Sequence, residues 1–341
     1  MVASRLVSLS ADEVASWHGG RLVLFVGVNT SGSVAHAVFG RWAAVLGRPW
    51  ALRSIDLPAT TPPEAFRGLV SAMRRNPSVD GAVITAHKLR VYRACGPDLD
   101  RRDWLTGITH EINALATGPV LAGYARDAVS LAHVLPVLIR STGAGTARDL
   151  HVLCLGAGGA ATALLLALYL DTDPGAGAAA GQEAEPGLRE DPPASVTFAD
   201  VDPRALTDLR AVAARAGISP RQLSFIHVRE PADCDALVAS LRSPGLVVNA
   251  TGLGKDIPGS PVTDRARFGP DILAWDLNYR GDLAFLRQAA AAGAGTMDGW
   301  EYFVAGWAGG LTAIAGTGFT SGLLARFARA AAPFRPEPAD R

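Results

Sequence analysis

Residues Leu150 to Leu170 read LHVLCLGAGGAATALLLALYL, and this stretch decides the fold class. A short apolar run over 151–155 stops at a cluster of glycines and alanines over 156–161, and a long Ala/Leu run follows. This order is typical of a buried strand, a tight glycine turn and a helix, which brings helix N-terminal N–H groups close to a pyrophosphate. The spacing G-x-G-x-x-A is a variant of the dinucleotide-binding fingerprint. The residues that it predicts to bind a dinucleotide are Gly156, Ala157, Gly158, Gly159 and Ala160.

The next apolar run supplies the second half of such a site. It covers 195–199 and ends in the acidic turn Asp200-Val201-Asp202. A dinucleotide site uses an acidic residue after its second strand to accept hydrogen bonds from ribose hydroxyls, so we expect Asp200 and Asp202 there. They come later than the usual spacing because residues 171–194, rich in Pro, Gly and Glu, have the composition of an inserted flexible loop.

Two other interpretations of 150–170 are open. The stretch is long and uncharged enough for a transmembrane helix. Its central glycines, the missing basic flank and the lack of any other such segment oppose that interpretation. The second alternative is a glycine turn without a ligand, and the acidic end of the following strand opposes it.

Length and charge narrow the class of protein. A chain of 341 residues indicates two domains. Lys+Arg and Asp+Glu are equal at 32, so the zero net charge argues against a nucleic-acid or anionic-membrane binder. Three cysteines have no metal or disulfide spacing, and we expect no metal site. The N-terminal residues lack the apolar core of a secretory signal, so a cytoplasmic location is expected.

Strands and helices alternate along the chain. Strands are expected over 21–27, 51–57 and 81–85, with helices over 34–46 and 62–75 between them. Further strands are expected over 195–199, 223–227, 245–249 and 272–277, and helices over 130–141, 203–216 and 300–332. This alternation predicts an α/β protein: an N-terminal α/β substrate domain and a Rossmann-type doubly wound dinucleotide-binding domain.

Lys88 is the first candidate for acid–base chemistry. The chain has only two lysines, Lys88 and Lys255, and otherwise relies on arginine for positive charge. Lysine, unlike arginine, changes its pKa readily when partly buried, which suits proton transfer. The alternative is a solvated surface lysine.

Other polar residues have plain alternatives as well. Asp127 stands just before an expected helix, where aspartate is a common N-cap. Asn113 fits a turn equally well, and His87 and His110 fit structural or solvated roles. The segment Asn249-Ala-Thr-Gly-Leu-Gly254 is either a loop or a polar turn beside a nicotinamide.

Taken in order, these segments resemble the shikimate/quinate dehydrogenase family over nearly the whole chain. The family's G-A-G-G-A is matched from Gly156 to Ala160, and its N-x-T-x-x-G by Asn249, Thr251 and Gly254. Its G-A-V-N-T and G-x-N-T-D are echoed less closely over 110–114 and 123–127. Its D-x-x-Y and G-x-x-x-L are echoed over 276–279 and 299–303.

The resemblance implies roles for individual residues. Lys88 and Asp127 correspond to the catalytic pair, and Asn249, Thr251 and Gly252 to a cofactor-binding turn. The residues expected to bind substrate are Thr30, Ser31, Ser33, Thr85, Asn113, Arg126 and Tyr279. The implied substrate-binding, catalytic domain is 1–128 plus 299–335, and the implied NAD(P)-binding Rossmann domain is 129–298.

The chain departs from the family where the ring of the substrate is recognised. Ile84 stands in place of a substrate-binding threonine unless Thr85 replaces it, and Gly306 stands in place of a late glutamine. The serine clamp is changed to Thr30-Ser31-Gly32-Ser33 without its proline, and Arg126 replaces a threonine. We therefore expect a related polyol acid or a different carboxylate met by Arg126, rather than shikimate itself.

The expected cofactor is NAD, because Asp200 and Asp202 would repel the 2′-phosphate of NADP and accept from a free 2′-hydroxyl. NADP stays open as an alternative cofactor, since Arg204 stands nearby.

The expected function is hydride transfer at a secondary alcohol of a cyclic hydroxy acid. The alternative is a non-catalytic, regulatory nucleotide-binding relative, for which a retained Lys88 and Asp127 serve no purpose. We expect a small-molecule carboxylate partner, no nucleic acid or membrane, and either a monomer or a homodimer.

Overall fold

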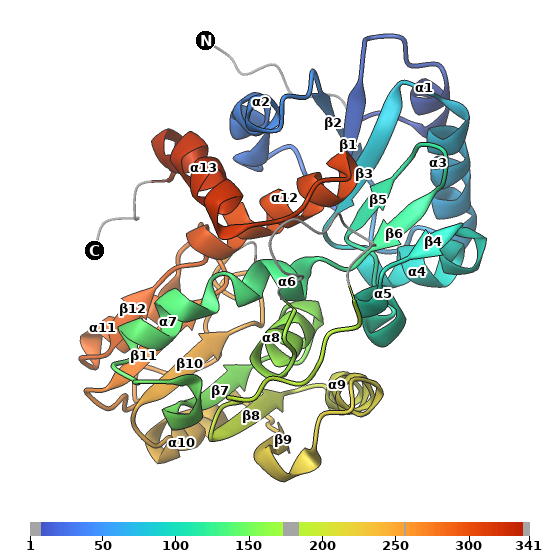
Figure 1. Ribbon diagram of the computed structural model, residues 1–341. Coiled ribbons are helices and arrows are strands. Elements are labelled where there is room, and N and C mark those ends of the chain that lie inside the picture. The colour runs from blue at the N-terminus through green and yellow to red at the C-terminus, as the bar shows by residue number, and fades with distance from the viewer. Residues whose placement is uncertain (1–7, 173–183, 256, 337–341) are drawn as a thin grey trace. The chain divides into compact units, whose positions relative to one another are not determined.

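The computed structural model describes residues 8–172, 184–255 and 257–336 (Figure 1). The chain divides into two compact units, each with its own sheet. The first unit includes Met1–Asp127 and Val304–Phe334, and the second includes Ala128–Asp173 and Pro186–Phe303.

The first unit is built on a mixed sheet with the strand order β2-β1-β3-β5-β6-β4. β1 pairs in parallel with β2 and β3, whereas β5 runs antiparallel to β3 and β6. The strands are β1 (Leu22–Gly27), β2 (Ala51–Asp56), β3 (Val79–Ile84), β4 (Arg101–Arg102), β5 (Ala114–Ala116) and β6 (Ala122–Tyr124). The N-terminal helices are α1 (Ala11–Ala15), α2 (Ala35–Val45), α3 (Pro63–Arg75), α4 (Lys88–Cys95) and α5 (Trp104–Thr109).

Helix α3 shows how the sequence determines these elements. It begins with Pro63 at its first position, and Glu64 in its first turn complements the helix dipole. Phe66, Leu69 and Met73 recur at helical spacing and are buried, so one face of the helix packs in the core of the unit. The central strand β1 is buried along its whole length, as expected for a strand covered on both faces.

The C-terminal helices pack against α2. They are α12 (Trp300–Ala315) and α13 (Ser321–Ala331), and α13 lies beside α2 (Figure 1). Trp42 of α2 is fully buried and stacks on Trp307 at 5.6 Å and on Phe327 at 5.9 Å between ring centroids. Its indole Nε1–H donates to the Phe327 carbonyl at 3.1 Å. Sequence-distant helices therefore share one aromatic core.

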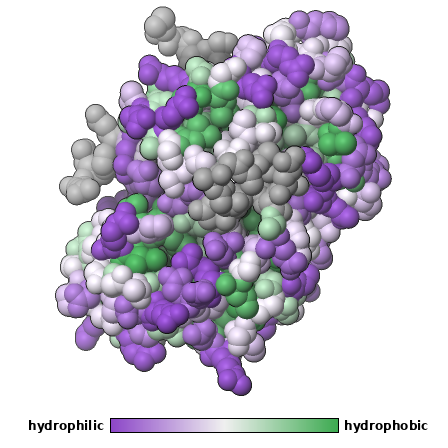
Figure 2. All heavy atoms as spheres, in the orientation of Figure 1, coloured by the Kyte–Doolittle hydropathy of each residue, from purple (hydrophilic) through white to green (hydrophobic). Residues whose placement is uncertain are grey.

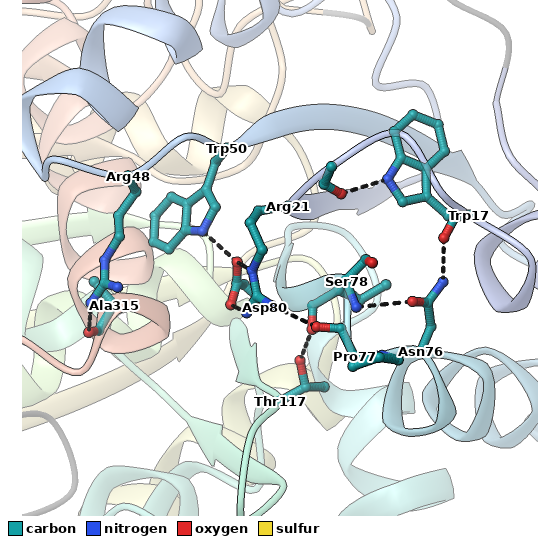
Figure 3. A network of polar contacts seen from close by, with 12 residues as sticks. Trp17, Arg21, Arg48, Trp50, Asn76, Pro77, Ser78, Asp80, Thr117 and Ala315 are labelled. Atoms are coloured by element: carbon teal, nitrogen blue, oxygen red, sulfur yellow. Dashed lines mark hydrogen bonds and ion pairs between the residues drawn. The ribbon is translucent and has the colours of Figure 1, made fainter.

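A polar network joins the amino ends of β1, β2 and β3 (Figure 3). Asp80 near the start of β3 accepts a hydrogen bond from the Trp50 indole at 2.6 Å and pairs with Arg21. Asn76 donates to the Trp17 carbonyl at 3.0 Å and accepts from the Ser78 N–H at 2.9 Å. These polar groups at the amino edge of the sheet are therefore hydrogen-bonded to one another.

The second unit confirms the predicted fold class. Its described strands form one sheet of six parallel strands in the order β12-β11-β10-β7-β8-β9, which is the doubly wound dinucleotide-binding order. The strands are β7 (His151–Leu155), β8 (Ser195–Asp200), β9 (Leu223–His227), β10 (Gly245–Asn249), β11 (Ile272–Asp276) and β12 (Gly295–Met297). The helices are α6 (Asp127–Ala132), which starts at the last residue of the first unit, α7 (Leu135–Ser141), α8 (Gly159–Tyr169), α9 (Pro203–Arg215), α10 (Pro231–Ser240) and α11 (Ala284–Ala291). Short 3₁₀ helices cover Gly96–Asp98, Ala147–Asp149, Pro220–Gln222 and Ala332–Phe334.

Several expected elements are divided differently. The stretch 150–170 is a strand and an 11-residue helix, so its transmembrane interpretation is wrong. No helix in the described part of the chain has the length and apolarity needed to cross a membrane. The helix expected over 130–141 is two helices, since Pro136 near the start of α7 cannot donate a backbone hydrogen bond. The helix expected over 300–332 is also two, because Gly316 adopts a left-handed φ of 67° that ends α12.

The expected inserted loop over 171–194 is described only in part, since 173–183 lie outside the described residues. Leu170 pairs with Leu188 in an isolated antiparallel bridge, so the described end of the insertion returns to the end of α8. On the face drawn in Figure 2, hydrophilic residues surround several separate hydrophobic areas.

Candidate active site

The carboxyl edge of the first sheet brings three polar segments together. The N–H and hydroxyl of Thr30, after β1, both donate to Asp56 Oδ1 at the end of β2, at 2.7 and 2.8 Å. The Thr85 hydroxyl, after β3, donates to the Val26 carbonyl at 3.3 Å. A Cβ on Gly27 would lie 2.8 Å from side-chain atoms of both Thr30 and Thr85, so the segments approach closely here. This is the edge at which open α/β sheets bind ligands.

The structure distinguishes Thr85 from Ile84. Ile84 is buried in the apolar core, and Thr85 is exposed at the end of the strand. Ser31 is exposed and donates to Asn29 Oδ1 at 3.2 Å, and the Ser33 hydroxyl accepts the N–H of Ala35 at 3.2 Å. Substrate binding by Thr30, Ser31, Ser33 and Thr85 stays a prediction.

Lys88 and Asp127 form an ion pair in the first unit. Lys88 begins α4 and Asp127 begins α6, and the Lys88 Nζ contacts Asp127 Oδ2. Their side chains are 19% and 16% exposed, so the pair is accessible but shielded from bulk water. Asn113 Nδ2 donates to Asp127 Oδ1 at 2.5 Å. Both oxygens of the Asp127 carboxylate are therefore held by protein groups.

A second set of contacts fixes the residues that lead to Asp127. The buried Asn113 accepts the Arg126 N–H at 2.8 Å, and Asp103 accepts the Ala125 N–H at 3.1 Å. The Arg126 guanidinium lies 3.8 Å from Asp103 Oδ2, with both side chains almost fully buried. Burial raises the pKa of the Asp103 carboxyl, and Arg126 opposes this rise. Arg126 thus has a structural contact, and its binding of a substrate carboxylate stays a prediction.

The histidines of this region have structural contacts. His87 is 2% exposed, and its Nε2 lies 2.7 Å from the Leu57 carbonyl oxygen. His110 adopts a left-handed φ of 57°, and its ring stacks on Tyr92 with centroids 4.9 Å apart. Glu111 follows His110, and no sequence motif predicts a role for it. Burial raises the pKa of the Glu111 carboxyl, and both Lys88 and Asp127 act on it electrostatically.

The glycine-rich loop of the second unit connects β7 to α8, where the sequence predicts a dinucleotide site. Gly156 has φ of 110°, and a Cβ there would lie 2.8 Å from the Ala250 backbone, so only glycine is tolerated. Gly158 caps α8, and a Cβ there would meet no heavy atom within 4 Å. The first-turn N–H groups of α8 lack intrahelical acceptors by geometry. Gly159 and Ala160 lie in this first turn, and the open glycine before it leaves the N–H donors uncovered. Binding of a pyrophosphate by Gly156, Gly158, Gly159 and Ala160 stays a prediction.

The two acidic residues at the end of β8, Asp200 and Asp202, make backbone contacts. Asp200 Oδ2 accepts the Ala157 N–H at 2.6 Å, and Asp200 Oδ1 accepts the Asp202 N–H at 2.8 Å. Asp202 in turn caps α9 by accepting the Arg204 N–H at 2.8 Å. Asp200 thus ties the glycine loop to the second strand. Ribose binding by Asp200 and Asp202, and cofactor binding by Ala157, stay predictions.

Asn249 organises the turn after β10. It is fully buried, its Oδ1 accepts the Thr251 hydroxyl at 2.7 Å, and its Nδ2 donates to Asp276 Oδ2 at 2.9 Å. Gly252 continues the turn with a φ of 80°. Burial raises the pKa of Asp276 to about 6, although bonds from Asn249 and Asn278 oppose the rise. Asn249 and Thr251 therefore shape the turn, and their contact with a cofactor stays a prediction.

Tyr279 follows this region in the second unit. Its ring lies 4.3 Å from Phe303 and 5.6 Å from Trp300 between centroids, in an aromatic cluster. Its substrate-binding role stays a prediction. Within residues 8–172, 184–255 and 257–336, no group of three or more His, Cys, Asp or Glu is arranged to hold a metal ion.

Comparison with known proteins identifies the family. No family model matches the chain. It is 30% identical over 279 residues to the shikimate dehydrogenase (NADP(+)) of Methylobacterium radiotolerans, covering 78% of this chain and 82% of that protein. The chain belongs to the shikimate dehydrogenase family. The predicted relationship to shikimate/quinate dehydrogenases, NAD(P)-dependent oxidoreductases, is thereby confirmed.

Solved structures with the shikimate dehydrogenase fold agree. Shikimate 5-dehydrogenase from Thermus thermophilus, in complex with NADP(H) and shikimate, has a TM-score of 0.63 and 21% identity, covering 91% of this chain and 99% of that one. Quinate dehydrogenase from Corynebacterium glutamicum, in complex with NAD, has a TM-score of 0.65 and 17% identity, with the same coverage. At these identities the two structures show the fold.

Proposed function

We propose that this protein transfers hydride between NAD and a secondary alcohol of a cyclic hydroxy acid, with Lys88 and Asp127 as its acid–base pair. The observation that carries the proposal is the ion pair itself, in which Asn113 holds the second oxygen of the Asp127 carboxylate. Asp127 links Lys88 and Asn113 through its two carboxylate oxygens, and this fixed geometry is what proton transfer requires. A purely nucleotide-binding relative has no use for this arrangement.

Three residues of the first unit, Lys88, Asp127 and Asn113, have different roles in proton transfer. When the alcohol is oxidised its hydroxyl loses a proton, and the neutral form of Lys88 accepts it at Nζ. Asp127 holds the lysine side chain and orients the same hydroxyl, and Asn113 fixes the carboxylate. In the reverse direction the Lys88 ammonium returns the proton to the carbonyl oxygen. NAD⁺, when bound, supplies the hydride acceptor.

The substrate class follows from what surrounds the pair. Exposed hydroxyls at Ser31 and Thr85 suit a ligand that carries several hydroxyl or carboxylate oxygens. Ile84 lies in the core, and a Cβ at Gly306 would meet no heavy atom within 4 Å. Since the buried Ile84 leaves only Thr85 to take the place of the family's threonine, and Gly306 has no side chain in place of its glutamine, a related polyol acid or another carboxylate is a better substrate than shikimate.

NAD is the proposed cofactor, with NADP as the alternative. Two carboxylates, Asp200 and Asp202, stand at the end of β8, and the residue between them, Val201, is 63% exposed and uncharged. A 2′-phosphate placed there would meet negative charge, whereas a 2′-hydroxyl finds acceptors. We also propose a cytoplasmic location, which suits three buried, free cysteines, and a monomer or homodimer.

The experiment is a screen of NAD- and NADP-dependent turnover over a panel that includes shikimate, quinate and related cyclic hydroxy acids. We expect NAD-dependent oxidation of at least one panel member, lost in Lys88→Ala and kept in Arg93→Ala, an exposed basic residue on the same helix. Calorimetry measures NAD binding in parallel. NAD binding without turnover of any member would favour the non-catalytic relative.

A further inference from the structure

Glu111 lies against the first residue of the helix that carries the acid–base lysine. The N–H of Ile112, the next residue, donates to the Lys88 carbonyl at 3.2 Å. Two residues later, Asn113 contacts Asp127. Glu111 is therefore followed directly by one residue bonded to Lys88, Ile112, and one bonded to Asp127, Asn113.

The carboxyl of Glu111 sits in a charged but poorly solvated place. The residue is half-buried, and no described residue donates a hydrogen bond to its carboxyl group. Lys88 from α4 and Asp127 from α6 act on it electrostatically, with opposite signs. His110 precedes it and stacks on Tyr92, also from α4. An ordinary surface glutamate would be exposed to solvent and would lie away from these charged groups.

We propose that Glu111 is a positioning residue that completes the acid–base centre and sets the proton affinity of Lys88. Its catalytic consequence rests on the proposed function, but the electrostatic coupling does not. The Lys88 ammonium then interacts with two carboxylates, Asp127 by direct contact and Glu111 electrostatically. With Glu111 ionised, protonated Lys88 is favoured, and with Glu111 neutral, Lys88 releases its proton more easily. The three groups titrate as one coupled unit.

This arrangement changes how the centre handles the proton of the alcohol. The proton moves from the substrate hydroxyl to the Lys88 Nζ, and no other reactant is needed. The positive charge that appears on Lys88 is stabilised by two carboxylates rather than one. Asp127 is held by Asn113 and Lys88, whereas the Glu111 carboxyl has no such protein donor, so its protonation state is free to respond to Lys88.

The chain offers a direct readout because it contains only two lysines. Labelling lysine with ¹³C at Cε gives one side-chain signal from Lys88 and one from Lys255, and a Lys255→Arg variant assigns them. The titration uses the full chain without substrate or cofactor. It therefore stays informative if the proposed activity fails, and a failed turnover screen would not explain its result.

We expect Glu111→Gln to lower the titration midpoint of Lys88 by about 0.5 to 1 pKa unit and to leave Lys255 unchanged. The matched control is Glu64→Gln on α3, whose side chain is 71% exposed and pairs only with Arg67 among the described contacts. It should move neither lysine. An unchanged Lys88 midpoint in folded Glu111→Gln, beside a shifted one in Asp127→Asn, would overturn the proposal.

A second measurement covers the case in which Glu111→Gln does not fold. In the unmodified protein, the Lys88 signal should show an additional inflection where the Glu111 carboxyl titrates, above the usual range for glutamate. ¹³C labelling of glutamate carboxyls locates that titration independently. A Lys88 curve with no inflection at the Glu111 midpoint would contradict the coupling.

Discussion

At the scale of single residues, Asp127 shows what the sequence predicts and what it leaves out. The sequence places Asp127 before a helix and, by family resemblance, beside Lys88. It does not reveal that Asn113 takes up the second carboxylate oxygen, or that Asp103 and Arg126 fix the preceding residues. Those contacts join segments far apart in the chain, so no local pattern predicts them.

Asp276 makes stability depend on pH. Burial raises its pKa to about 6, above the value near 4 of an unfolded chain. The folded protein therefore binds more protons than the unfolded one between these values. The contribution of this group to stability is greatest at low pH and falls as pH rises through about 6.

The replacement Asp276→Asn removes this titration. The variant loses a hydrogen bond at every pH, which lowers its unfolding free energy by a constant amount. Between pH 5 and 7.5, its unfolding free energy should rise by about 1 to 2 kcal/mol relative to that of the unmodified protein. Chemical denaturation at the two pH values measures the change. An identical difference between the two proteins at both pH values would show that Asp276 does not titrate there.

At the scale of elements, two glycines of the loop before α8, Gly156 and Gly158, are needed for different reasons. Gly156 is required by the protein itself, since a Cβ there meets the Ala250 backbone at 2.8 Å. Gly158 has open space around it, so a side chain there would clash only with a bound ligand. The sequence motif treats these glycines alike, and only the structure separates their roles.

This difference predicts distinct outcomes for two alanine variants. Gly156→Ala should destabilise the protein by about 1 to 3 kcal/mol, because it combines a clash with a positive φ. Gly158→Ala should keep the stability of the unmodified protein and weaken NAD binding about tenfold or more. Thermal unfolding and calorimetric titration of NAD measure the two effects. Normal NAD affinity in Gly158→Ala would place the pyrophosphate elsewhere.

The end of β8 governs the choice of cofactor. Asp200 must stay, because its carboxylate holds the Ala157 N–H. Val201→Arg with Asp202→Ser adds a partner for a 2′-phosphate and removes one carboxylate, while serine keeps a side chain able to cap α9. We expect the ratio of NADP to NAD affinity to rise at least tenfold, measured by titration of both cofactors. Tighter NADP binding by the unmodified protein would contradict the charge argument.

At the scale of the whole molecule, the order of strands in the second unit follows from the sequence, because buried parallel strands and glycine turns leave clear local patterns. The packing of the C-terminal helices on α2 does not. It depends on Trp42 meeting Trp307 and Phe327, which are separated from it by more than 260 residues of sequence. Within the expected helix over 300–332, the end of α12 at Gly316 is visible only once the left-handed φ is known.

The aromatic core around Trp42 should dominate the stability of the first unit. Trp42→Ala removes a fully buried ring and should cost about 3 to 5 kcal/mol. Trp104→Ala is the matched control, since Trp104 is 43% exposed, and it should cost less than about 1 kcal/mol. Denaturant unfolding of both variants measures the difference. Equal losses would mean that the C-terminal helices contribute little to the core.

The acid–base pair is tested most directly by steady-state turnover of Lys88→Ala, Asp127→Asn and the double variant, with a substrate from the panel and NAD titration on each protein. Loss of one proton-transfer group should lower turnover by about 10²–10⁴-fold while NAD affinity stays nearly unchanged. The double variant should lose less than the product of the two single losses, because the residues act as a unit. Near-normal turnover in Lys88→Ala, with NAD still bound, would contradict the account.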